Sequence, residues 1–307
     1  MRVTLLGPQR RPTIEAVVRS RRIEGPIATI TAGWQEREPD DAELSDLLGS
    51  RDVNLSLFRR WLDVQERDPE YTAGERRLQG VLAELQDIYL LRLDHALQAV
   101  YAIQRRSGGG SDQLQAEAVA EAVAAVRELD AAHLQHISDI RGEFYQRWQP
   151  HHRPLIAEHR AAVAGLLGDA AALVIAGGHV GVLAEALHLF NVAASLRSPV
   201  IAWSAGAMAL TDRIVLFYDR APQGPGHPEL YGGGLSVLRD VVLLPHARAR
   251  MLLEDAHRMA VFARRFAPAR CVPLEHGSRV DTDSEGAFPP GTRVLAGDGH
   301  MTALEAA

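Results

Sequence analysis

The sequence contains no lysine, so all 33 of its basic residues are arginines. Against 39 acidic residues they leave a formal net charge of −6, and this balance does not indicate the basic surface that nucleic-acid partners require. The one cysteine, Cys271, cannot form a disulfide within the chain, so nothing points to an oxidising compartment. We expect Cys271 to pack as a small buried apolar side chain.

Long hydrophobic runs are also missing. No apolar stretch approaches the ~18 residues that a membrane span needs, and residues 1–7 form too short a run for a secretory signal. We therefore expect a cytoplasmic protein with no membrane partner. Hydrophobic residues make up 47% and charged residues 23%, as in ordinary globular proteins, so 307 residues can bury a large core.

Short apolar runs alternate with helical stretches in both terminal parts of the chain. This alternation predicts an α/β fold, a doubly wound and mainly parallel sheet with helices on its faces. The expected strands are residues 2–7, 27–31, 53–57, 171–176, 199–203, 214–218 and 241–244, with shorter ones near 270–274, 278–281 and 292–295.

Residues 59–149 carry no strand signal. Apolar residues recur there at steps of three and four, from Leu78 to Ile103 and from Val119 to Phe144, which predicts two long amphipathic helices with a flexible turn at 107–111. We interpret this region as a helical hairpin inserted into a catalytic domain formed by 1–58 and 150–307. Its apolar stripes indicate a core or a homodimer interface.

One polar stripe in the hairpin has a spacing found in metal sites of helical bundles. It consists of Asp130, His133, His136 and Asp139, and Glu84 or Asp87 could lie opposite it. Charged helix faces are usually solvated, so we expect a solvated face here and predict neither a metal nor another cofactor.

Ser204 is the residue that most strongly suggests chemistry. It follows the apolar run 199–203 and precedes small residues with helix propensity. A nucleophile elbow needs small residues two positions before and after the nucleophile, and Ala202 and Gly206 stand there. Such a turn lifts the hydroxyl above the carboxyl ends of the strands, at a helix N-terminus that favours negative charge.

A serine nucleophile needs a base, and the base needs an acid that orients it. His246 follows the apolar run 241–244 and is the first candidate for the base, since it should also lie at the carboxyl edge of a sheet. Asp219, after the run 214–218, is the first candidate for the acid. The competing histidines are His227, His257 and His276, and the competing carboxylates are Asp240 and Asp212.

Acyl transfer also needs N–H donors for an oxyanion. The N–H groups of Ala205, directly after the serine, and of Gly178, in a glycine pair after the run 171–176, are the expected donors. Arg220 or Arg248 could bind a substrate carboxylate through a bidentate pair. The residues expected to contact substrate are Gly177, His179, Trp203 and Arg248.

Together these segments resemble the peptidase E and cyanophycinase family, serine peptidases with a class I glutamine amidotransferase-like fold. The resemblance lies in the Ala-Gly-Gly-His run at 176–179, the Trp-Ser-Ala-Gly-Ala run at 203–207, Asp219 and His246. It extends over about 1–58 and 150–296, with Thr-Ala-Gly at 31–33 fitting the same fold.

The resemblance implies a Ser-His-Asp/Glu site that hydrolyses peptide bonds next to aspartyl groups. By position, Ser204 is the nucleophile, His246 the base, and Gly178 and Ala205 the oxyanion donors, while Asp219 matches the acid by placement only. The helical insertion and Ala247, where the family has an aromatic residue after the histidine, depart from its pattern.

The leading hypothesis is a serine hydrolase, a peptidase or amidase that acts on a small peptide or amide through an acyl-enzyme on Ser204. Two alternatives use the same fold. One is a non-catalytic binding or assembly protein whose insertion recruits a partner or a second copy, and the other is an acyltransferase with an acceptor other than water.

Overall fold

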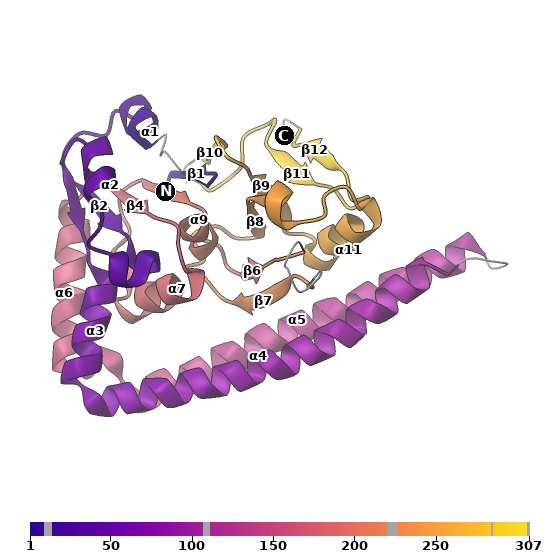
Figure 1. Cartoon of the computed structure of the whole chain (residues 1–307), viewed down its shortest axis with the longest axis horizontal. Coiled ribbons are helices and arrows are strands. Elements are labelled where there is room, and N and C mark those ends of the chain that lie inside the picture. The colour runs from indigo at the N-terminus through magenta and orange to yellow at the C-terminus, as the bar shows by residue number, and fades with distance from the viewer. Residues whose placement is uncertain (9–13, 107–110, 220–225, 284, 306–307) are drawn as a thin grey trace.

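The computed structural model describes residues 1–8, 14–106, 111–219, 226–283 and 285–305. The chain forms a mixed α/β body with a long helical hairpin along one side (Figure 1). Most of the turn predicted at 107–111 lies outside the described residues, as does Arg220.

The main sheet has six strands in the order β10-β1-β5-β4-β2-β3, and all neighbours are parallel except the edge strand β10. Because Leu6 pairs with Trp203, and Ile175 with both Ala202 and Ile30, the carboxyl ends of the central strands meet at one edge. Ligand sites of open parallel sheets lie at this edge. The strands are β1 (Val3–Leu6), β2 (Ile27–Ile30), β3 (Asp52–Asn54), β4 (Ala172–Ile175), β5 (Val200–Trp203) and β10 (Arg279–Asp281).

Helices pack on both faces of this sheet. Successive side chains of a strand point to opposite faces, so Ala202 packs in one core cluster and Trp203 in the other. The larger cluster includes α3 (Leu57–Arg67), α6 (Pro154–Asp169) and α7 (Val180–Leu189), and the smaller one includes α1 (Ile14–Ser20) and α2 (Ala42–Leu47).

The later strands do not extend the main sheet, so the prediction of one sheet was wrong for 214–218 and 241–244. A second sheet has the order β12-β11-β9-β8, and β6 pairs only with β7. Strand β8 pairs in parallel with β9, and helix α11 connects the two strands. The apolar run of a strand does not specify which other strand it pairs with. The elements are β6 (Ile214–Leu216), β7 (Glu229–Gly232), β8 (Val241–Pro245), β9 (Arg270–Leu274), β11 (Arg293–Leu295), β12 (Met301–Ala303) and α11 (Ala256–Phe266).

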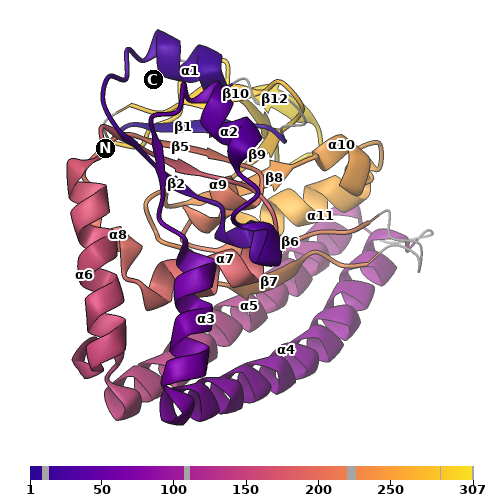
Figure 2. The ribbon, with the colours of Figure 1, turned by 60° about the vertical axis from the view of Figure 1, so that its left-hand side comes forward.

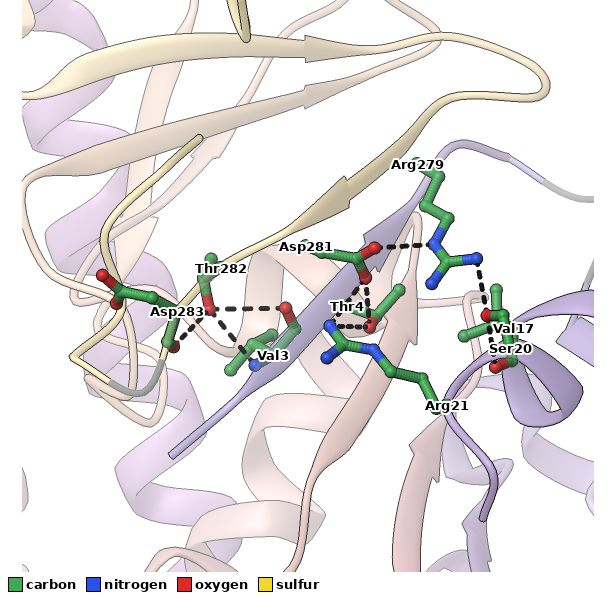
Figure 3. Close-up of polar contacts among 9 residues, drawn as sticks. All are labelled: Val3, Thr4, Val17, Ser20, Arg21, Arg279, Asp281, Thr282 and Asp283. Carbon is green, nitrogen blue, oxygen red and sulfur yellow. Dashed lines mark hydrogen bonds and ion pairs between the residues drawn. The ribbon is translucent and has the colours of Figure 1, made fainter. Parts of the chain in front are cut away.

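Side-chain contacts fasten β10 to the first strand of the chain (Figure 3). The hydroxyl of Thr4 donates to Asp281 at 2.7 Å, and Arg21 donates to the same carboxylate oxygen at 2.8 Å. Arg279 donates to the other oxygen at 2.9 Å. The segment that leaves β9 is thereby held beside β1.

The two long helices predicted for the hairpin are confirmed as α4 (Pro69–Gln104) and α5 (Asp112–Trp148), which pack along each other. Residues 59–67 belong instead to α3, which packs on α7 and on the 3-10 helix Ala32–Arg37. Figure 2 shows α3 and α6 rising from the base of the hairpin toward the main sheet.

A buried polar cluster docks the hairpin onto the α/β body. Arg265 of α11 forms an ion pair with Asp130 of α5, and Tyr89 of α4 donates to the same carboxylate at 2.8 Å. His133 stacks on Tyr89 with ring centroids 3.9 Å apart. The expectation of a solvated face was therefore wrong for Asp130 and His133, which are only 6% and 3% exposed, because α11 and β7 cover this part of α5.

Three further findings concern the described residues alone. None of their helices has both the length and the apolar character to cross a bilayer. No group of three or more histidine, cysteine, aspartate or glutamate side chains among them is arranged to hold a metal ion. Cys271 is 1% exposed on β9, as expected, and burial raises the pKa of its thiol to about 12.

Candidate active site

Ser204 occupies a strained turn between β5 and the short helix α9 (Ala205–Ala209). Its φ of 52° and ψ of −122° lie outside the regions that residues with a side chain normally adopt. Gly206 explains how the turn fits against β4, since a Cβ there would lie 2.4 Å from the carbonyl oxygen of Ile175 and 2.6 Å from that of Ala176. The strand, the strained serine and the required glycine together form a sharp strand-to-helix turn.

The glycine pair after β4 lies directly against this turn. A Cβ on Gly177 would lie 3.0 Å from the Cβ of Ser204, so a side chain there would press on the serine. Gly178 has a φ of +119°, a conformation that favours glycine. A Cβ at this position would also lie 2.3 Å from the carbonyl oxygen of Gly33. Within the described part of the chain, no hydrogen bond uses the backbone N–H of Gly178 or Ala205, so both remain able to donate to a ligand.

A cavity of about 450 Å³ opens above the serine. It brings together five residues that the sequence singled out as site residues: Ser204, His246, Gly177, Gly178 and Trp203. The other lining residues were not predicted as site residues: Pro8, Gly33, Trp34, Arg37, Asp40, Glu43 and Leu44.

His246 reaches this cavity from the second sheet. It follows β8 directly, has a left-handed backbone (φ 57°, ψ 34°) and begins the short helix α10 (Ala247–Arg250). Its N–H donates to the carbonyl of Leu274 at 3.1 Å. Its placement at a strand's carboxyl end is confirmed, although that strand does not belong to the sheet that carries Ser204.

Asp219 is buried beside α11, and the cavity lining does not include it. Among the described residues, its carboxylate accepts hydrogen bonds from the backbone N–H of Leu252 (3.2 Å) and from Arg258 (2.7 and 3.2 Å). These contacts tie Asp219 to the segment just after α10. Its role as the orienting acid stays a prediction.

The two competing carboxylates occupy other places. Asp240 precedes β8 and His246 follows it, so the two lie about 20 Å apart at ~3.3 Å per residue. Asp212 follows α9 and forms an ion pair with Arg213 at 2.8 Å. The geometry therefore removes Asp240 as a partner of His246.

Sequence reasoning missed Glu275. It follows β9, which lies beside β8 with Pro245 paired to Leu274, so Glu275 and His246 leave adjacent parallel strands at the same end. Its Oε1 accepts from the N–H of Arg248 at 2.9 Å, at the start of the helix that His246 caps. The strand-end argument that selected His246 applies equally to Glu275.

The arginine and histidine side chains that could contact substrate line three different cavities. Arg248 lines a neighbouring cavity of about 680 Å³ together with Glu275, whereas Arg37 lines the cavity above Ser204. His179 caps α7, accepting from the N–H of Val182 at 3.2 Å, and lines a third cavity described below.

The competing histidines also lie elsewhere. His227 pairs with Asp94 of α4 at 3.3 Å, His257 is exposed near the start of α11, and the ring of His276 contacts the carbonyl of Pro8 at 3.1 Å.

No protein-family model and no curated protein sequence matches the chain. Among solved structures, the chain is similar to the crystal structure of a peptidase from an acI-B1 Actinobacterium. The identity is 12%, the alignment covers 99% of this chain and 94% of that one, and the TM-score is 0.48.

Proposed function

We propose that the protein is a serine hydrolase, a peptidase or amidase, in which Ser204 attacks the carbonyl of a small peptide or amide. The observation that carries this proposal is the backbone of Ser204, strained at φ 52° and ψ −122° at the mouth of a cavity that His246 also lines. Strained backbone of this kind persists where the surrounding structure enforces it, and it gathers at functional sites.

The chain's own residues account for each step of acyl transfer. His246 takes the proton of the Ser204 hydroxyl as the oxygen bonds to the carbonyl carbon, and later gives that proton to the leaving amine. The N–H groups of Ala205 and Gly178 stabilise the oxyanion that forms. Water, activated by the same histidine, then cleaves the acyl-enzyme and regenerates the serine.

Two carboxylates are candidates for the group that orients His246. Asp219 is the residue that the resemblance to peptidase E indicates, and Glu275 is favoured by its place beside His246 at the end of β9. The comparison of Asp219→Asn with Glu275→Gln separates them. Neutralising the carboxylate that orients His246 should lower kcat about 10⁴-fold, since the imidazole then takes the wrong tautomer.

The resemblance further implies cleavage next to aspartyl groups, as in a class I glutamine amidotransferase-like peptidase of the cyanophycinase type. Arg37 in the cavity lining supplies a cation for such a carboxylate. Its Nε lies 3.4 Å from Asp40 in an exposed pair, which a substrate carboxylate could replace with little loss because exposed pairs contribute little.

Labelling with a fluorophosphonate probe tests the nucleophile. We expect the purified protein to be labelled at Ser204, and Ser204→Ala to lose both labelling and at least about 10⁴-fold in hydrolysis while keeping its thermal transition. Ser236→Ala is the matched control, because Ser236 also has a positive φ (54°) but does not line the cavity. Labelling that persists in Ser204→Ala would refute the mechanism.

The same experiment decides between the leading function and its alternatives. An absence of labelling at Ser204 favours a binding or assembly protein. Labelling followed by transfer of the acyl group to an added amine, with no hydrolysis, favours an acyltransferase.

We also propose that the hairpin mediates a homodimer. Val81, Ile88 and Leu91 lie on one side of α4 and are 48%, 51% and 63% exposed. Apolar side chains that gather on one face of an exposed helix are typical of a protein interface.

A further inference from the structure

The third cavity, of about 440 Å³, begins one residue away from the candidate active site. Gly177 and Gly178 line the cavity above Ser204, while His179 and the first turn of α7 line this one. Its opposite wall comes from α3 and α4, the start of the hairpin region. The aromatic residues in the lining are Phe58, Trp61 and Tyr231.

Glu75 of α4 lines this cavity and is 9% exposed. Its Oε2 accepts from the indole N–H of Trp61 at 3.2 Å and from the side-chain amide of Gln65. Among the described residues, no hydrogen bond reaches Oε1 and no cation pairs with the carboxylate. Burial is the largest cause and raises the pKa of Glu75, and the charge of Glu185 also raises it; the hydrogen bonds from Trp61 and Gln65 and the charge of Arg141 offset this only in part.

The other charged side chains that line the cavity do not form an ion pair with Glu75. Glu185 is already neutralised by Arg141, which donates through both terminal nitrogens, one of them at 3.0 Å. Arg76 is exposed, so water screens its charge. The cavity therefore combines aromatic walls with a carboxylate, Glu75, of which only Oε2 accepts hydrogen bonds from the described residues.

We propose that this cavity is a specificity subsite for a basic side chain of the substrate. The apolar stem would pack on Phe58 and Trp61, and the terminal ammonium or guanidinium would donate to Glu75. Aromatic faces attract such cations, and a charge-assisted hydrogen bond to a buried carboxylate adds selectivity. This inference rests on the proposed hydrolase function, since the subsite would select what Ser204 cleaves.

The test compares a cation with a neutral molecule of the same shape. Binding of pentylamine and of 1-pentanol to the full-length protein is measured by calorimetry, and kcat/KM is measured for peptides that differ only in lysine or norleucine. We expect the wild-type protein to prefer the amine and the lysine peptide, and Glu75→Gln to reduce both preferences by about 10- to 100-fold. Glu84→Gln, an exposed carboxylate on the same helix, should keep them.

Trp61→Phe provides a second variant if Glu75→Gln does not fold. It keeps an aromatic wall but removes the N–H that holds Glu75, so the preference for the amine should fall severalfold. Equal amine affinity in the wild type and in Glu75→Gln, or no preference in the wild type, overturns the subsite. Failure of the fluorophosphonate to label Ser204 contradicts the hydrolase function instead, and amine binding does not depend on that reaction.

Discussion

Replacement of Gly206 by alanine should slow the reaction at Ser204 without unfolding the protein. The added Cβ would lie 2.4 Å from the carbonyl oxygen of Ile175, whereas Cβ contacts below 3.0 Å essentially do not occur. The turn that carries Ser204 must therefore move by about 0.6 Å away from β4. Since a misplacement of ~1 Å can cost 10²-fold in rate, we expect labelling and kcat/KM to fall about 10- to 100-fold.

The rate of fluorophosphonate labelling under pseudo-first-order conditions measures this effect directly. Urea unfolding of the same variant should show a loss of about 1–3 kcal/mol, as for other overpacked sites. Gly165→Ala in α6 is the control, because a Cβ there meets nothing within 4 Å, and it should label at the wild-type rate. Labelling of Gly206→Ala at the wild-type rate would refute the argument that this close contact positions Ser204.

Three further predictions concern the hairpin. Asp130→Ala leaves the buried guanidinium of Arg265 without its counter-ion and should lower the free energy of unfolding by about 3–5 kcal/mol in urea titrations. The control, Asp139→Ala, removes an exposed carboxylate and should change the free energy of unfolding by less than ~0.5 kcal/mol. A loss below ~1 kcal/mol for Asp130→Ala would contradict the role of this ion pair in docking the hairpin. Burial lowers the pKa of His133 from 6.5 to about 4, so the stability that its neutral form contributes is present above pH 6.5 and is lost as the pH falls toward 4. The loss should be on the order of 2 kcal/mol at pH 5. His133→Gln should flatten this pH dependence of the free energy of unfolding, and an equally steep profile in the variant would contradict the prediction. If the hairpin forms a homodimer, Ile88→Glu should convert it to a monomer in analytical ultracentrifugation, and a wild-type protein that sediments as a monomer would exclude this interface.

Several features could be predicted from the sequence because they depend on local spacing. The turn at Ser204 needs small residues at fixed positions, and the two long helices follow from apolar steps of three and four. The position of His246 after a strand was also predictable, since the apolar run 241–244 ends two residues before it. The burial of Asp130 and His133 was not, because their polar side chains are covered by α11 and β7, which are distant in the sequence.

The sequence by itself therefore determined the two long helices, the strands of the main sheet, the turn at Ser204 and the strand-end histidine, since each depends on neighbours within a few residues, whereas β7 and β12 were not predicted. Only the tertiary structure decided that β8 and β9 form a separate sheet, which places Glu275 beside His246. It also created the cavity that holds Glu75, whose walls come from α3, α4 and α7. Pairing and burial of this kind depend on contacts between distant segments, and no local pattern of residues specifies them.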